Sequence, residues 1–116
     1  MSLDKIIHLR RSIRKYNDKK PDWRTIIECI DAMRYAPMAG GNFTLKFILV
    51  SEESKIQRLA QAAQQKFIAT AHYVVVVCSK PRRTINSYKN RGKVYVRQQA
   101  GAAIQNFLLK LTEKGL

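Results

Sequence analysis

The chain has 116 residues, 46% of them apolar, which is the size and composition of one globular domain and argues against global disorder. Its 22 Lys and Arg against 8 Asp and Glu give a net charge of +14, which attracts phosphates on a nucleotide, a nucleic acid or a membrane without choosing among them. No apolar run approaches the roughly 20 residues of a membrane helix, and the first residues lack a signal-peptide pattern, so we expect a cytoplasmic protein without a membrane partner.

The N-terminal third of the sequence predicts two helices. A short amphipathic helix runs into the basic segment 10–16, and its end would let the basic side chains point to one side. Asp22 is suited to be the N-cap of a second helix, which ends before Pro37 because the residue before a proline is pushed out of the helical region. The apolar face of that helix consists of Trp23, Ile26, Ile27, Ile30 and Met33.

The middle of the sequence predicts a loop, a strand and a third helix. The glycine pair at 40–41 marks a tight loop, and residues 46–50 are aromatic and β-branched as in a strand. Ser51 is expected to cap the next helix, with Glu52 and Glu53 in its first turn, where the helix dipole favours acids.

The last third predicts a buried strand and a long helix. Residues 73–78 form a continuous apolar run, which is typical of a strand covered on both faces. Residues 79–93 are expected to be a loop, with six basic residues and no acid. A long helix is predicted from about Val94 to Lys114, and Gly115 is well placed as its C-cap.

This order of elements predicts a single domain, residues 1–116, of the α/β class. Strands separated by helices favour a layered domain with a mixed sheet flanked by helices. Two strands make a poor sheet, and the chain stops where a third strand would be expected. We therefore expect the sheet to be completed by further C-terminal residues or by a partner subunit.

The two cysteines are expected to be small buried hydrophobes. Cys29 and Cys78 each sit inside an apolar pattern, far apart and with no histidine nearby. This spacing argues against both a disulfide framework and a metal site.

Three segments carry residues suited to ligand chemistry. The cluster 10–14 has three arginines, whose guanidinium groups bind phosphate oxygens bidentately, and a serine hydroxyl. The loop 36–42 has small residues that let the backbone approach a flat ligand. The segment 98–106 has small residues that permit close helix packing at a subunit interface or in a core. Each has an ordinary structural explanation as well: a solvated face, a turn and a core helix. Tyr88 and Tyr95 could stack on bases, or serve as surface and core aromatics.

Four segments occur in the order and approximate spacing of the nitroreductase family, which the chain resembles over nearly its whole length. The sequence Arg-Arg-Ser-x-Arg-x-Tyr at 10–16 resembles the family's N-terminal FMN-phosphate motif. Residues 34–42 resemble its Ala-Pro-Ser-x-x-Asn loop, and residues 65–71 before a valine strand resemble its central segment. Residues 101–109 look like its long interface helix.

The resemblance implies a nitroreductase-like α+β fold and an FMN-dependent homodimer that takes hydride from NAD(P)H and passes it to a nitroaromatic, a quinone or a similar acceptor. It implies that the arginines and serine of 10–14 hold the FMN phosphate and ribityl chain, and that the loop 37–42 approaches the flavin of the same or the partner subunit. Gln65 or Lys66 would touch the ring edge or the ribityl hydroxyls. The implied cofactor-binding residues are Arg10, Arg11, Ser12, Arg14, Pro37, Met38, Ala39, Gly40, Gly41, Asn42, Gln65 and Lys66. No catalytic acid, base, nucleophile or metal ligand is implied.

Two alternatives remain open at this stage. Met38 replaces the family's loop serine and residues 43–45 replace its Gln-Pro-Trp, so a truncated flavin-fold module without catalysis is one alternative. A basic nucleic-acid-binding domain is the other, suggested by the net charge and the 80–97 stretch. No helix-turn-helix, zinc-finger or RNA-recognition pattern supports a nucleic acid partner.

Overall fold

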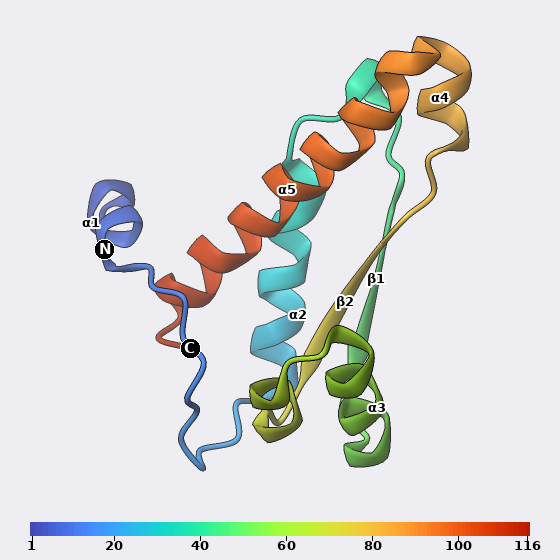
Figure 1. The fold of residues 1–116 in the computed structure, drawn as a ribbon. Helices are drawn as coiled ribbons and strands as arrows, with labels where there is room; N and C mark the ends of the chain where they lie inside the picture. Colours follow the sequence, from blue (N-terminus) through green and yellow to red (C-terminus); the bar gives the residue numbers. More distant parts are fainter.

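Helices and short 3-10 turns surround a single pair of strands in the computed structural model, which describes residues 1–116 (Figure 1). This helix-rich α+β arrangement confirms the expected fold class. In chain order the elements are α1 (Leu3–Leu9), α2 (Trp23–Asp31), the turns η1 (Ala32–Tyr35) and η2 (Ala39–Gly41), β1 (Leu45–Val50), α3 (Glu53–Ala63), the turn η3 (Lys66–Thr70), β2 (Val74–Ser79), α4 (Arg82–Tyr88) and α5 (Asn90–Glu113).

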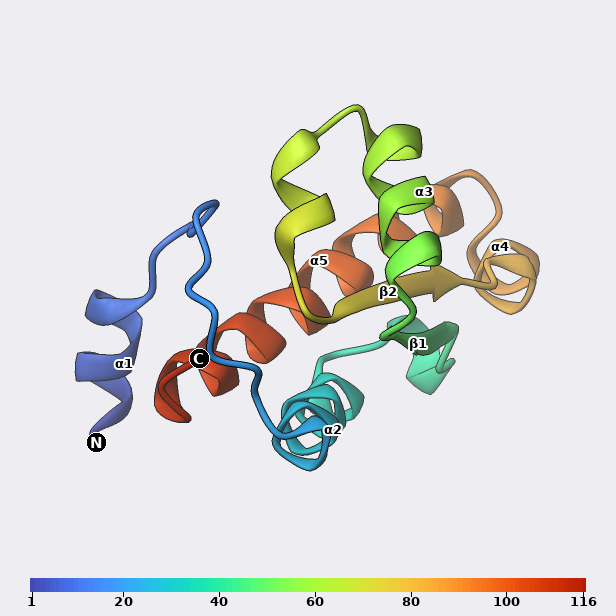
Figure 2. The same cartoon turned by 90° about the horizontal axis from the view of Figure 1, so that it is seen from below.

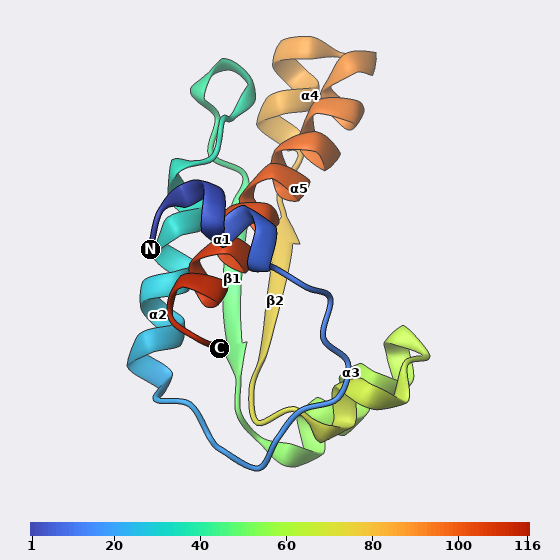
Figure 3. The same cartoon turned by 90° about the vertical axis from the view of Figure 1, so that its left-hand side faces the viewer.

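The two strands are antiparallel, and their register fixes which segments lie at each end of the sheet. Leu45 pairs with Ser79, and Val50 pairs with Val74. The turn η2 and helix α4 therefore adjoin one end of the sheet, and α3 and η3 adjoin the other, as Figure 3 shows. This division decides the geometry of the candidate site.

One face of the sheet packs on the long helix α5 and on the segment after α2. The buried cluster consists of Met33, Ala36, Leu45 and Ala103, with Phe47 and Val77 packed against it. Figure 1 shows α2 and most of α5 on one side of the strands, and in Figure 2 α2 and α3 lie on opposite sides of them. The core is thus built from the contacts of these helices with one sheet face.

The other face of the sheet is not covered within this chain, so the prediction that the second strand is covered on both faces is wrong here. Ile48 points to that face and is 41% exposed, and every apolar residue of β2 is half-buried. Cys78 is likewise half-buried, whereas Cys29 is fully buried as expected, and both are free thiols.

The first two helices correct the sequence prediction in detail. Helix α1 ends at Leu9, and the basic segment that follows is not helical, so its side chains do not project from a helix end as expected. Asp22 does cap α2, because its carboxylate accepts a 2.9 Å hydrogen bond from the Arg24 amide. The predicted apolar face of α2 is only partly buried, since Trp23 is 51% exposed and Ile27 44% exposed.

The third helix begins one residue later than predicted. Glu52, and not Ser51, is the N-cap residue of α3, and its carboxylate accepts a hydrogen bond from the Ser54 hydroxyl. Glu53 lies in the first turn, as expected from the helix dipole.

The basic segment 79–93 is not the loop that the sequence predicts, because it contains α4 and the first turn of α5. Gly92 makes this possible: a Cβ there would lie 2.6 Å from the Ile85 Cα and 2.7 Å from the Thr84 carbonyl oxygen. The two helices therefore pack backbone to backbone at this point, so that α5 starts at Asn90.

The end of α5 confirms the predicted role of Gly115. This glycine has φ +77°, and its amide donates to the Thr112 carbonyl at 3.1 Å. The Leu116 amide donates to the Leu111 carbonyl at 3.0 Å, which completes a Schellman motif.

The chain exposes more surface than a self-contained domain of its mass. Its accessible surface is 8547 Å², whereas a folded monomer of 13.4 kDa is expected to expose about 6500 Å². Only 14 of the 116 residues are buried, and the exposed apolar side chains include Ile48 on the sheet and Val94 and Ile104 on α5. None of the helices has the length and apolar character needed to span a membrane.

Candidate functional site

The basic segment after α1 lies next to the turn η3. The Arg14 guanidinium is 6.0 Å from the centre of the Phe67 ring, and the Tyr16 ring is 6.3 Å from the same ring. Partial burial raises the pKa of Tyr16, against the opposing positive charge of Arg14, so this phenol stays neutral near pH 7. The contacts with Phe67 bring the predicted phosphate-binding segment close to the predicted residue Lys66.

The arginines of this segment are available for an anion. None of Arg10, Arg11 and Arg14 forms an ion pair with an acidic side chain. Arg11 donates only to main-chain carbonyls, to His8 at 2.6 Å and to Arg10 at 3.0 Å, which satisfies acceptors left free at the end of α1. Ser12 and Arg14 are exposed beside it. The segment therefore concentrates uncompensated positive charge on an extended, accessible stretch of chain.

An amide-rich cavity of about 450 Å³ adjoins η3. Gln65 and Lys66 line it, as do three glutamines of or next to α3: Gln57, Gln61 and Gln64. Gln64 adopts a left-handed conformation with φ 55°, which turns the chain from α3 into η3. Amide side chains both donate and accept hydrogen bonds, so this wall suits hydroxyl groups or ring heteroatoms.

The predicted loop 37–42 is a short 3-10 turn held by two main-chain hydrogen bonds. The Gly41 amide donates to Met38 and the Asn42 amide to Ala39, each at 3.1 Å. Gly40 and Gly41 have φ values of +60° and +70°, a conformation that favours glycine. A Cβ at Gly41 would meet nothing within 4 Å, so this part of the loop is open to an approaching group.

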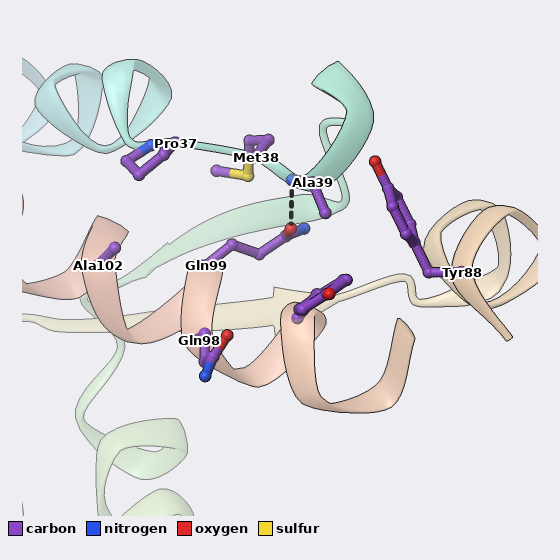
Figure 4. Close-up of a pocket in the computed structure, with 8 residues that line it drawn as sticks. Pro37, Met38, Ala39, Tyr88, Gln98, Gln99 and Ala102 are labelled. Carbon is purple, nitrogen blue, oxygen red and sulfur yellow. Dashed lines mark hydrogen bonds between the residues drawn. The ribbon is translucent and has the colours of Figure 1, made fainter. Parts of the chain in front are cut away.

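A buried glutamine of α5 fixes this loop. The Gln99 carbonyl oxygen accepts a 3.0 Å hydrogen bond from the Ala39 amide (Figure 4). The Gln99 amide nitrogen donates to the Thr44 hydroxyl at 2.5 Å. Gln99 is only 4% exposed. The two hydrogen bonds connect the start of η2 and the residue before β1 to one point on α5, which gives the loop a defined position.

A second cavity, of about 500 Å³, lies between this loop, α4 and α5 (Figure 4). Pro37, Met38 and Ala39 form one wall. The opposite walls carry Tyr88 from α4 and, from α5, Tyr95, Gln98, Gln99 and Ala102.

The structure does not bring all the predicted cofactor-binding residues together. Arg14 and Lys66 lie near the Val50 end of the sheet, whereas Pro37–Asn42 lie at the Leu45 end. Five steps of about 3.4 Å join the six residues of β1, so the two ends of the strand are about 17 Å apart. One chain therefore presents two half-sites that face different regions.

Sequence reasoning assigned the loop wall of the second cavity to cofactor binding and considered Tyr88 and Tyr95 as stacking or packing aromatics, but it found neither the helix α4 nor the role of Gln99. The spacing of Thr84, Ile85 and Tyr88 fits one helix face and could have indicated α4, but the run of basic residues obscured it. No sequence signal pairs Gln99 with a loop sixty residues earlier, because that contact depends on how α5 packs.

Comparisons with known proteins agree with this geometry. The model of the nitroreductase family matches residues 7–71 and 55–116. A protein of Archaeoglobus fulgidus, assigned as an NADH dehydrogenase/NAD(P)H nitroreductase, is 30% identical over 106 residues, which make up 90% of this chain and 58% of that relative.

Solved structures show the same fold. A nitroreductase family protein from Clostridium novyi NT superposes with a TM-score of 0.85 at 21% identity, over 99% of this chain and 66% of that one. An FMN-dependent nitroreductase from Clostridium difficile R20291 superposes with a TM-score of 0.78 at 25% identity, over 95% of this chain and 60% of that one. This chain thus spans about three fifths of the length of these relatives, and it belongs to the nitroreductase family.

Proposed function

We propose that the protein is an FMN-dependent oxidoreductase that takes electrons from NAD(P)H and reduces a small-molecule acceptor. The observation that carries the proposal is the uncompensated arginine segment 10–14 beside the amide-rich cavity at η3. The family membership and the FMN-dependent relative from Clostridium difficile support it.

The residues of the first half-site fit the phosphate end of FMN. Three guanidinium groups without acidic partners and one hydroxyl offer the donors that a phosphate dianion requires. Arg10, Arg11, Ser12 and Arg14 would hold the phosphate. Gln65 and Lys66 would hydrogen-bond the ribityl hydroxyls or the ring edge, because they line the adjoining cavity.

The loop Pro37–Asn42 fits the flat ring of FMN, but it lies at the other end of the sheet. We infer that a second copy supplies this loop, so that each flavin is held between the arginine segment of one subunit and the loop of the other. The positive φ values of Gly40 and Gly41 and the open space at Gly41 allow the main chain to approach a ring.

When bound, FMN supplies the redox chemistry, since it accepts a hydride from NAD(P)H and donates electrons to the acceptor. The protein's own residues bind and orient it. The arginines neutralise the phosphate, and Gln99 holds the loop in place through Ala39 and Thr44.

A homodimer would cover the apolar surface that this chain leaves exposed. Val94 is 50% exposed and Ile104 38% exposed on α5, and Gly101 between them has no neighbour within 4 Å of a Cβ position. Small and apolar residues on one helix face suit close packing against another subunit. Ile104→Glu is therefore expected to convert a dimer into a monomer in light scattering, whereas Glu113→Gln at the exposed end of α5 leaves the mass unchanged. A wild-type chain that is monomeric at high concentration would contradict the dimer.

The cofactor proposal is tested by reconstitution with FMN. The protein is incubated with FMN and desalted, and retained flavin is measured by absorption and by fluorescence quenching. The wild type is expected to retain FMN. Arg10→Gln and Arg14→Gln should each weaken FMN binding by about tenfold, because each removes a charge-assisted hydrogen bond.

Arg24→Gln is the matched control. Arg24 lies in the first turn of α2, is exposed, and its guanidinium carbon stands 5.4 Å from the centre of the Trp23 ring. Arg24→Gln removes one positive charge, as Arg10→Gln and Arg14→Gln do, and should leave FMN binding unchanged. A colourless wild-type protein after desalting would refute the cofactor proposal, and retained FMN that NADH and NADPH do not bleach would refute the enzymatic part.

A further inference from the structure

We propose that the outer face of α4 binds the phosphate backbone of double-stranded DNA without reading its sequence. This face, together with the cations next to it, is called the α4 surface and consists of Lys80, Arg82, Arg83, Asn86, Ser87, Lys89 and Arg91. The α4 surface is independent of the proposed function, because none of its residues belongs to the arginine segment, to the loop 37–42 or to either cavity.

The α4 surface lies at one end of the molecule and is open to solvent. Figures 1 and 3 show α4 beyond the Leu45 end of the sheet, beside η2 and the start of α5. One side of the helix is covered, because the Thr84 carbonyl and the Ile85 Cα lie against Gly92. Every residue of the α4 surface is exposed, so the opposite side is accessible to a large partner.

Main-chain hydrogen bonds hold both ends of this surface in place. The Lys80 amide donates to the Thr44 carbonyl at 2.6 Å, which connects the entry into α4 to the start of β1. Lys89 has φ 53°, and its amide donates to the Ile85 carbonyl at 2.6 Å, so the chain turns there from α4 into α5. The cations therefore project from a fixed pair of helices.

The charge of the α4 surface is not compensated within the chain. None of its five cations takes part in an ion pair. No Asp or Glu occurs between Glu53 and Glu113. Glu53 begins α3 at the Val50 end of the sheet, and Glu113 ends α5, about 35 Å along that helix from Asn90. A polyanion at the α4 surface therefore meets uncompensated positive charge.

The positions of the side chains around α4 suit a groove with phosphates on both sides. Successive residues of a helix are about 100° apart, so Arg82 and Arg83 project to either side of Asn86. The major groove of B-DNA, about 12 Å wide, admits an α-helix between its two phosphate backbones. The major groove of an RNA duplex is deep and narrow and does not. This geometry favours a DNA duplex over an RNA duplex.

The composition of the α4 surface argues against other anionic partners. It has no apolar side chain, whereas a helix on a membrane buries an apolar face and a protein interface has an apolar and aromatic core. It also lacks the aromatic rings on which single-stranded bases stack. Arg, Lys, Asn and Ser are side chains that donate hydrogen bonds to DNA phosphates, and such contacts carry no sequence information. Binding of this kind needs no sequence-reading motif.

Salt dependence reports how many phosphates are contacted. Each phosphate contact with a DNA duplex contributes about −0.9 to the slope of log affinity against log salt concentration. If all the cations of the α4 surface make such a contact, the slope is about −4.5, and with a smaller number engaged it lies nearer −3.

The experiment measures binding of a short, fluorescein-labelled DNA duplex of mixed sequence by fluorescence anisotropy at a series of salt concentrations. The wild type is expected to give a slope of about −3 to −4.5 and to bind an RNA duplex or a DNA single strand of the same sequence more weakly. Arg82→Gln/Arg83→Gln should make the slope shallower by about two and weaken binding by about twentyfold at moderate salt. Arg82→Lys/Arg83→Lys, which keeps both charges, should retain the wild-type slope.

Arg24→Gln/Arg58→Gln is the matched control, because it also removes two positive charges. Both arginines are exposed and form no ion pair. They lie in the first turn of α2 and in α3, and Figure 1 shows these two segments at the end of the molecule opposite α4. At that distance salt screens their charges, so the slope should stay that of the wild type. Far-UV circular dichroism should be the same for both double variants and the wild type.

Equal loss of DNA binding in the two glutamine double variants would overturn the inference, since affinity would then follow net charge alone. An RNA duplex or a single strand that binds as tightly as the DNA duplex would overturn it as well. Binding to phosphatidylserine vesicles that is lost in Arg82→Gln/Arg83→Gln would assign the surface to a membrane instead. FMN retention is measured on the same proteins, and FMN retained by a wild type that does not bind DNA would refute this inference alone.

Discussion

The substitution Gly92→Ala tests the packing on which the second cavity depends. The added Cβ would lie 2.6 Å from the Ile85 Cα and 2.7 Å from the Thr84 carbonyl, whereas ordinary contacts begin at 3.4 Å. Both neighbours are main-chain atoms of α4, which cannot rotate away as a side chain can. The helix α4 must therefore shift away from α5.

The expected cost follows from two opposing terms. Overpacking of this kind lowers the free energy of unfolding by about 1–3 kcal/mol, and the higher helix propensity of alanine raises it by about 0.5–1 kcal/mol. We expect a net loss of about 1–2 kcal/mol in the free energy of unfolding, with the thermal midpoint lowered by roughly 4–8 °C per kcal/mol. Urea unfolding followed by circular dichroism measures this difference.

Gly101→Ala on the same helix is the control, because a Cβ there meets nothing within 4 Å. In monomeric protein, Gly101→Ala should raise the free energy of unfolding by about 0.5–1 kcal/mol, since only the higher helix propensity of alanine acts there. The displaced α4 would also carry Tyr88 away from the loop. A Gly92→Ala protein as stable as the wild type would refute the close packing of α4 on α5.

Two further predictions concern the core. Gln99→Leu should lower the free energy of unfolding by about 2–4 kcal/mol, because the Ala39 amide and the buried Thr44 hydroxyl both lose their hydrogen-bond partner. Hydrogen exchange of the Ala39 amide should also become faster. Unchanged exchange would show that the loop does not depend on the two hydrogen bonds of Gln99. Burial raises the pKa of the Cys29 thiol, so the folded state favours the neutral form. The contribution of this thiol to the free energy of unfolding should be full below its unfolded pKa of about 8.5. That contribution should fall as the pH rises through the higher folded pKa. Urea unfolding between pH 7 and 10 should show a smaller decline in Cys29→Ala than in the wild type, and parallel declines would contradict this role of the thiol.

Much of the local structure could be predicted from the sequence because it depends on near neighbours. Asp22 caps α2 through an amide two residues away, and the amides of Gly115 and Leu116 end α5 through bonds to carbonyls three and five positions earlier. The loop glycines Gly40 and Gly41 have the positive φ values that their pairing suggested. These features follow from the preferences of single residues for particular backbone conformations.

The location of the basic residues could not be predicted in the same way. The many basic residues of the segment 79–93 conceal the helix α4, whose main chain packs directly on Gly92 of α5. The basic segment after α1 is extended, with Arg14 and Tyr16 packed beside Phe67, a residue more than fifty positions away.

The sequence by itself determined most of the elements and the family, because motif order and hydrophobic pattern are properties of the chain. Only the tertiary structure decided where those motifs lie. The antiparallel register of β1 and β2 places Lys66 and the loop Pro37–Asn42 at opposite ends of the sheet. Packing of α5 then brings Gln99 and Tyr95 to that loop. Such long-range contacts arise from the burial of apolar faces against one another, which no local pattern specifies.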